Sequence, residues 1–101
     1  MHPLVVNMKV SEFDVNICRP NKYGNPFIVG IHGTRKACCK KYIQWISGLI
    51  EAPARAVAPS KAEIGADLKG KRLGCVCAPL QCHGDYLAHV ANPAKGLFSF
   101  K

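Results

Sequence analysis

A buried strand that passes within a few residues into a helix is the feature that most constrains this chain. Residues 71–77 form an apolar, β-prone run, and a tight loop containing Pro79 follows it. A helix then begins near Cys82 or His83 and runs to about Ala91, where an Asn-Pro pair stops it. A strand joined to a helix in this way is typical of α/β domains.

Two further strands are predicted near the N-terminus. Residues 4–10 are rich in β-branched and apolar side chains, and residues 13–18 alternate between apolar and polar. Residues 11–12 between them would then form the turn of a hairpin. The following segment, residues 19–27, is dense in Pro, Gly and Asn, which predicts an irregular loop of the kind that often carries function.

Two helices are predicted between this loop and the final strand. Thr34 is a suitable N-cap for a helix over residues 35–50. Its apolar stripe, which would pack on the sheet, consists of Cys38, Tyr42, Trp45, Ile46 and Leu49. Ser60 and Glu63 form a capping-box pattern for a shorter helix that ends at about Leu68.

Together these elements predict an α/β fold in one domain over residues 1–101. A sheet of three to four strands would be covered by two to three helices, in a Rossmann-like or related sandwich. A chain of 101 residues with 49% hydrophobic residues has room for one ordered core. No export signal or membrane-spanning run is found, so we expect a soluble cytoplasmic protein, in the host cell if it is phage-encoded.

The cysteines and the charge restrict the partners. Among the six cysteines, Cys38 and Cys39 are adjacent and Cys75 and Cys77 are one residue apart, which favours reduced thiols over disulfides. The net charge of +8 favours anionic partners, namely nucleic acid, a nucleotide or a phosphorylated metabolite. Because the basic residues are scattered, a surface of merely solvated charges is an equal alternative.

The chemistry is concentrated at the junction between the last strand and the last helix. Side chains two apart on a strand share a face, so Cys75 and Cys77 should project together. Cys82 and His83 lie where free N–H groups and the helix dipole favour a thiolate or a bound anion.

Three interpretations of this junction compete. In the first, a zinc ion is held by Cys75, Cys77, Cys82 and His83, although this spacing departs from the usual Cys-x2-Cys knuckle. In the second, Cys82 is a nucleophile or His83 a general base, with Asp85 as an orienting or acid/base carboxylate. A binding variant of the second has the amides of residues 82–84 hold a phosphate. In the third, the cysteines fill the core, His83 is a satisfied surface residue and Asp85 only stabilises the helix N-terminus.

The chain resembles an uncharacterised domain family that is widespread in phages and bacteria. The resemblance rests on Gly-Asn-Pro-Phe at residues 24–27 and Cys-His-Gly-Asp at residues 82–85. It extends to Arg19, to the Gly-Thr-Arg run at residues 33–35 and to residues 70–79. The resemblance implies family membership and gives no activity, but it makes the loop that contains Arg19 a partner of the cysteine segment.

We therefore expect one pocket for a nucleotide-like or modified-base anionic ligand. Its ligand-binding residues would be Arg19, Asn25, Phe27, Cys77 and Gly84. Asn25 would read a polar edge and Arg19 would meet negative charge, while Cys82, His83 and Asp85 would be the catalytic residues if the protein hydrolyses or transfers at a glycosidic or phosphoester bond. The alternative is a non-enzymatic basic module that binds nucleic acid or a host protein, with a structural zinc or a cysteine-filled core.

Overall fold

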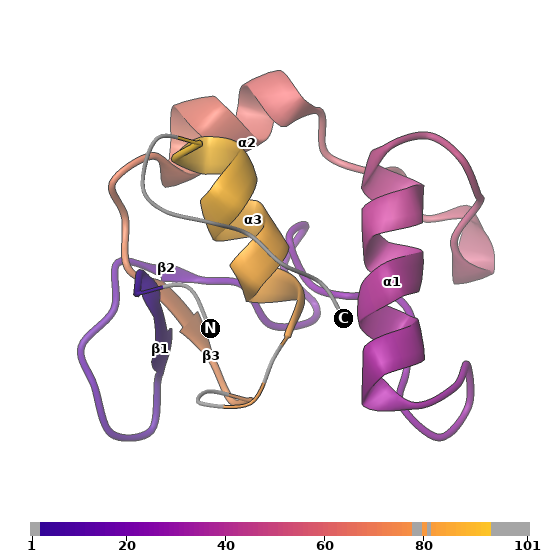
Figure 1. Ribbon diagram of the computed structural model, residues 1–101, viewed down its shortest axis with the longest axis horizontal. Helices are drawn as coiled ribbons and strands as arrows, with labels where there is room; N and C mark the ends of the chain where they lie inside the picture. Colours follow the sequence, from indigo (N-terminus) through magenta and orange to yellow (C-terminus); the bar gives the residue numbers. More distant parts are fainter. Residues whose placement is uncertain (1–2, 78–79, 81, 94–101) are drawn as a thin grey trace.

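Three short parallel strands form the sheet of this protein. The structure, a computed structural model, describes residues 3–77, 80 and 82–93. Strands β1 (Val5–Asn7) and β2 (Val15–Asn16) both pair in parallel with β3 (Leu73–Cys75), giving the order β1-β3-β2 (Figure 1). The central strand β3 is buried at every residue, as expected for a parallel strand covered on both faces.

The predicted N-terminal hairpin is wrong. Strands β1 and β2 lie on opposite sides of β3, so residues 11–12 belong to a connection that crosses the sheet. Phe13, on this connection, packs against β3 so closely that a Cβ on Gly74 would lie 2.7 Å from the phenyl Cγ. Both short strands pair instead with β3, which is buried at every residue. All three strands are also shorter than predicted, and β3 ends at Cys75.

The helices begin where the sequence predicts. Helix α1 (Arg35–Ile46) is capped by Thr34, whose side chain accepts a hydrogen bond from Ala37 N at 3.2 Å. Helix α2 (Lys61–Leu68) begins with the predicted capping box, and α3 (His83–Ala91) has the predicted bounds. A 3-10 turn at Pro53–Arg55 lies between α1 and α2.

Helix α1 ends earlier than the predicted residue 50. Gly48 adopts a left-handed conformation, with φ of 79°, directly after the last helical turn, and this ends the helix as glycine commonly does. Leu49, predicted to lie on the buried stripe, is 74% exposed. The other stripe residues, Cys38, Tyr42, Trp45 and Ile46, are buried as predicted.

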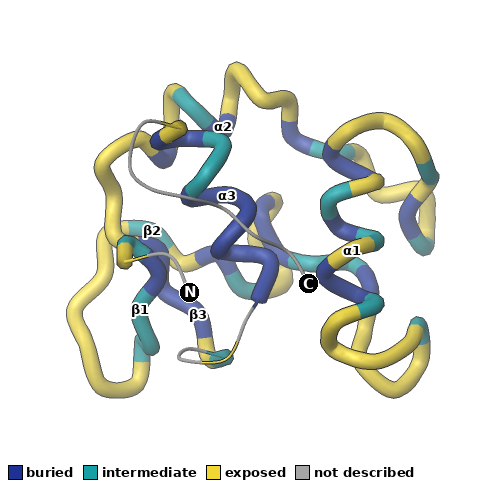
Figure 2. The backbone as a smooth tube through the Cα atoms, in the orientation of Figure 1, coloured by how far each residue is buried: buried dark blue, intermediate teal, exposed yellow. Residues whose placement is uncertain are grey.

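Helix α3 is the centre of the packing. It contacts α1, α2, β1 and β3, and Figure 2 shows that it is buried along most of its length, whereas the loops around it are exposed. Its first turn lies directly on the sheet, since a Cβ on Gly84 would lie 2.6 Å from Ile17 Cδ1. The predicted small α/β fold is confirmed. In the part of the chain that the structure describes, no helix is long and apolar enough to cross a membrane.

Candidate functional site

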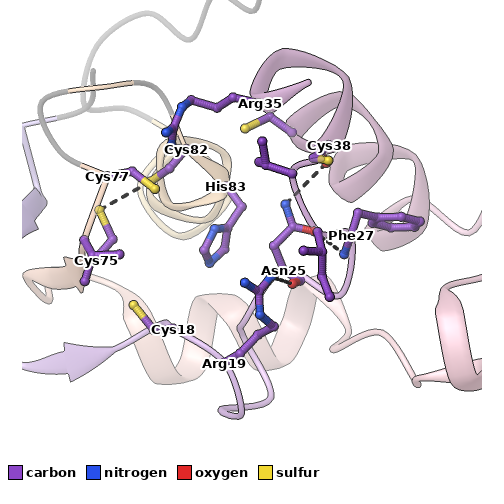
Figure 3. A pocket seen from close by; sticks show the side chains of 14 residues that line it. Cys18, Arg19, Asn25, Phe27, Arg35, Cys38, Cys75, Cys77, Cys82 and His83 are labelled. Atoms are coloured by element: carbon purple, nitrogen blue, oxygen red, sulfur yellow. Dashed lines mark hydrogen bonds between the residues drawn. The ribbon is translucent and has the colours of Figure 1, made fainter. Parts of the chain in front are cut away.

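A pocket of about 310 Å³ opens between the loop after β2, the first half of α1 and the end of β3 (Figure 3). It brings together the two segments that the sequence predicts to share a site. The described residues that line it are Cys18, Arg19, Asn25, Phe27, Ile28, Val29, Arg35, Cys38, Cys39, Cys75, Val76, Cys77, Cys82 and His83. Gly84 and Asp85, both predicted as site residues, are buried beneath this wall and do not line it.

Asn25 organises one wall of the pocket. Its Nδ2 donates to the carbonyl of Cys38 on α1 at 3.3 Å, and its Oδ1 accepts from Phe27 N at 2.9 Å. The carbonyl of Asn25 in turn accepts from Arg19 Nη1 at 2.7 Å. The Asn25 amide thus holds the loop on α1 and sets the turn that orients Phe27. The predicted role of Asn25 in reading a polar edge of a ligand stays a prediction.

Tyr23 fixes the same loop from its other side. The buried hydroxyl of Tyr42 donates to the carbonyl of Tyr23 at 2.9 Å, and the Tyr23 hydroxyl donates to Asp67 on α2. Lys22 reaches Glu63 at 3.1 Å and Asp67 at 3.2 Å. Burial, together with the bond to Asp67, raises the pKa of Tyr23 to about 12, so it stays a donor at neutral pH. The loop is therefore held on both α1 and α2.

Two guanidinium groups give the pocket its charge. Arg19 comes from the loop and Arg35 from the first turn of α1, and both are exposed residues that line the cavity. None of the described lining residues carries a carboxylate. The site therefore presents positive charge over walls of sulfur and apolar side chains.

The three cysteines of the junction gather at one end of the pocket (Figure 3). The Cys82 thiol donates to Cys75 Sγ at 3.5 Å. Burial raises the pKa of Cys39 to about 11, whereas the hydrogen bond from Cys82 and the charges of Arg35 and Arg19 lower the pKa of Cys77 to about 6. The Cys82 thiol, which donates to its neighbours, has a raised pKa and stays protonated. The ionised thiolate is therefore favoured at Cys77 and disfavoured at Cys82, the predicted nucleophile.

The predicted zinc site is not formed. His83 turns away from the sulfurs, so that its Nε2 lies 2.8 Å from the carbonyl of Ile17 and its ring packs on Tyr42 with centroids 4.9 Å apart. Adjacent residues at the start of a helix project in different directions, which separates His83 from Cys82. Among the residues that the structure describes, no three His, Cys, Asp or Glu side chains are arranged to hold a metal ion.

His83 is also unsuited to the predicted role of general base. Burial lowers its pKa from 6.5 to about 4, and a neutral imidazole facing a carbonyl must donate its Nε2 proton there. The ring thus ties the first turn of α3 to the strand edge at Ile17. The alternative in which His83 is a satisfied surface residue is wrong, because His83 is buried.

Two of the three amides of the predicted phosphate cradle at residues 82–84 have partners within the protein. Cys82 N donates to Asp85 Oδ2 at 3.2 Å, and Gly84 N donates to Cys82 Sγ at 3.3 Å. Asp85 is 3% exposed and completes a capping box with Cys82. This confirms the alternative in which Asp85 stabilises the helix N-terminus. The N–H groups of Cys82 and Gly84 are therefore engaged within the protein, whereas the guanidinium groups of Arg19 and Arg35 line the pocket.

Sequence reasoning missed part of the lining. Arg35 is the most consequential omission, because it supplies half of the positive charge and contacts Cys77. Its signal is its position directly after the N-cap Thr34, within the Gly-Thr-Arg run at residues 33–35. Cys38 was predicted only as part of the buried stripe of α1, and Cys18 and Cys39 had no pattern beyond residue type; all three line the cavity because their elements converge there.

Fold and pocket together define the class: a small α/β domain with a cysteine-rich, arginine-flanked cavity. By sequence, the chain belongs to the family described as Domain of unknown function (DUF4326), which matches residues 6–93. It is 41% identical over 93 residues to the "Uncharacterized 12.4 kDa protein in nrdA-td intergenic region" of Enterobacteria phage T4, covering 87% of this chain and 76% of that protein. No solved structure matches. The predicted resemblance to a phage and bacterial family is confirmed.

Proposed function

We propose that this phage-associated protein binds a small, nucleotide-like anion in the pocket between the loop at residues 19–29, helix α1 and the end of β3. The observation that carries the proposal is the pairing of Arg19 with Arg35 at a cavity whose remaining wall is apolar or sulfur-containing. Guanidinium groups recognise phosphates by charge-assisted, often bidentate hydrogen bonds.

The size and lining of the cavity favour a single nucleotide or a smaller ligand. Its volume of about 310 Å³ is at the lower end of the roughly 300–1,000 Å³ typical of small-molecule sites. Phe27, Val29 and Val76 offer apolar contact to a base, and the two arginines are exposed residues of the lining that offer charged hydrogen bonds to a phosphate. The anchors at Asn25 and Tyr23 keep the loop in place before binding, which reduces the entropy lost on association.

The proposal assigns binding and no hydrolysis. Cys82, His83 and Asp85, the catalytic candidates from the sequence, each make hydrogen bonds that hold the start of α3. A residue so placed contributes to the shape of the site, and removing it would disturb the fold before it disturbed a reaction step.

The experiment is a thermal-shift and calorimetric screen of the full chain under reducing conditions. Probes are inorganic phosphate and nucleoside mono-, di- and triphosphates, tested on wild type, Arg19→Ala, Arg35→Ala and the control Lys36→Ala. The control removes the same charge from the next residue of α1, which does not line the pocket. A charged hydrogen bond is worth about 1.5–3 kcal/mol, so each arginine variant should weaken binding by roughly 10- to 100-fold.

Two results would contradict the proposal. One is the absence of any stabilisation by these probes, since a ligand at about 100 times its Kd adds about 2.7 kcal/mol. The other is an equal loss of binding in Arg35→Ala and Lys36→Ala. Binding of long single-stranded nucleic acid that falls steeply with salt, without competition by nucleotides, would favour the basic nucleic-acid module instead.

A further inference from the structure

The carboxylates of this chain, except Glu51, have partners within the fold. Two pairs of exposed carboxylates each lie against one basic residue, and a further carboxylate is buried in the capping box of α3. These carboxylates are Glu12 and Asp14 at Arg72, Glu63 and Asp67 at Lys22, and Asp85. The net charge of +8 is thus left on basic side chains outside these pairs.

Helix α1 carries the part of this charge that borders the pocket. It contains Arg35, Lys36, Lys40 and Lys41 and no carboxylate. Arg35 lines the pocket, and Lys41 donates to the carbonyl of His32. Lys36 and Lys40 are exposed, and neither forms an ion pair with another residue in the described part of the chain. These two lysines can therefore meet an anion from outside the protein.

Lys36 and Lys40 form a row that begins beside the pocket. Residues four apart on a helix lie on the same face, with Cβ atoms about 5–6 Å apart. Lys36 directly follows Arg35, and Lys40 lies about one turn further along α1. The row therefore leads away from the pocket in a step comparable with the spacing of successive phosphates along an extended strand.

Exposed apolar side chains lie beside this charge. Ile28, Val29 and Val76 line the pocket and are 36%, 53% and 52% exposed. Ile31, in the same loop as Val29, is 72% exposed. A face of merely solvated charges needs no apolar surface next to it, whereas apolar side chains that gather at a pocket mark an interaction site. A nucleic acid strand fits both features, since it combines the apolar faces of its bases with anionic phosphates.

We propose that the nucleotide in the pocket is one unit of a single-stranded nucleic acid whose adjoining phosphates bind Lys36 and Lys40. This inference rests on the proposed nucleotide pocket and adds the partner to which the nucleotide belongs. A single strand fits better than a duplex, because the cavity of about 310 Å³ takes one base and a duplex keeps its bases stacked and paired until they are extruded.

The salt dependence of binding reports the number of phosphate contacts. Each phosphate neutralised on a single strand adds about 0.7 to the steepness with which log affinity falls with log salt. Contacts by Arg19, Arg35, Lys36 and Lys40 together give a slope of about −2.8, and the arginines alone give about −1.4. Between about 50 and 200 mM salt, the affinity should fall about 50-fold for the wild type and about sevenfold without the two lysines.

The experiment measures binding of the reduced full chain to fluorescent oligothymidylate and oligouridylate of about eight nucleotides. Thymidine monophosphate is tested alone by calorimetry and as a competitor. The variant is Lys36→Ala with Lys40→Ala, and the control, Lys61→Ala with Lys69→Ala, removes the same charge from the two ends of α2, on another side of α3 (Figure 1). A preference between the two oligomers distinguishes DNA from RNA, which alone carries the 2′-hydroxyl.

We expect the monophosphate to compete with the oligonucleotide. The Lys36→Ala, Lys40→Ala variant should bind the oligonucleotide roughly 10- to 100-fold more weakly, with the shallower salt slope, and should bind the monophosphate like the wild type. The control should keep the wild-type affinity for both ligands.

Three results would overturn the inference, and they are distinguishable. Normal monophosphate binding with no loss of oligonucleotide affinity in the lysine variant, or with an equal loss in the control, would remove the strand and leave the pocket. Competition by polyglutamate as strong as that by unlabelled oligothymidylate of the same charge would favour an acidic polypeptide as the partner. Oligonucleotide binding without any binding or competition by the monophosphate would overturn the nucleotide pocket itself.

Discussion

Protonation of His83 should make the fold sensitive to mild acid. In the folded protein this ring is buried against Tyr42 and donates to the carbonyl of Ile17, and burial lowers its pKa from 6.5 to about 4. The His83 ring therefore binds a proton below about pH 6.5 in the unfolded chain, but only below about pH 4 in the folded protein. Stability is fully present above the unfolded pKa and is lost as the pH falls toward the folded pKa.

The magnitude follows from the two pKa values. At pH 5 the imidazole is almost fully protonated in the unfolded chain and almost fully neutral in the folded protein. The pH has then fallen about 1.5 units below the unfolded pKa of 6.5, and each of these units lowers the free energy of unfolding. At 1.36 kcal/mol per unit, the free energy of unfolding should fall by about 2 kcal/mol between pH 7 and pH 5. The lowered pKa values of Asp14, Glu63 and Asp67 keep these carboxylates ionised in the fold at pH 5, so His83 dominates this window.

The assay is urea unfolding at pH 7 and pH 5 for wild type, His83→Gln and Gly65→Ala. Glutamine can keep the donor to the Ile17 carbonyl but cannot titrate, so His83→Gln should lose little stability over this range. Gly65→Ala changes no titratable group and should keep the wild-type loss. An equal loss of about 2 kcal/mol in His83→Gln, or an NMR titration of the His83 ring near pH 6.5, would refute this reasoning.

Three other substitutions test the packing, each by urea unfolding at pH 7. Gly84→Ala places a Cβ 2.6 Å from Ile17 Cδ1 at the contact of α3 with the sheet and should cost about 1–3 kcal/mol; a change below 0.5 kcal/mol, on the order of a neutral surface substitution, would contradict the close approach. Gly65→Ala meets nothing within 4 Å at an ordinary helical residue and should stabilise by about 0.5–1 kcal/mol, so destabilisation would count against the placement of α2. Ser60→Ala removes the capping box of α2 and should cost about 1 kcal/mol, whereas no loss would show that the cap is not formed.

The starts of the helices are predictable from the sequence because their signals are local. Thr34 and Ser60 accept hydrogen bonds from amides three residues further on, so a short stretch of sequence contains both partners. The end of α1 has a local signal too, in Gly48, but the apolar residues beyond it extend the helical pattern and obscure the stop.

Strand pairing and the inner geometry of the site are not local and could not be predicted in the same way. Whether β1 pairs with β2 or with β3 depends on which strand is buried, and β3 lies more than fifty residues away. The sequence places Cys82 and His83 side by side at a helix start, but it does not reveal that His83 hydrogen-bonds the carbonyl of Ile17. The convergence of Arg19 and the cysteine segment is predictable from the family resemblance, whereas Arg35 joins them only through the packing of α1.

The most direct test of the central claim is an amide NMR titration of the reduced protein with a nucleoside monophosphate. We predict saturable shifts confined to the loop at residues 19–29, the first turn of α1 and residues 75–77, with α2 unchanged. Saturation of Arg35→Ala should need roughly 10- to 100-fold more ligand than saturation of the wild type or of Lys36→Ala. Shifts scattered over the basic surface, or none at millimolar ligand, on the order of the weakest specific affinities, would contradict a nucleotide pocket at this site.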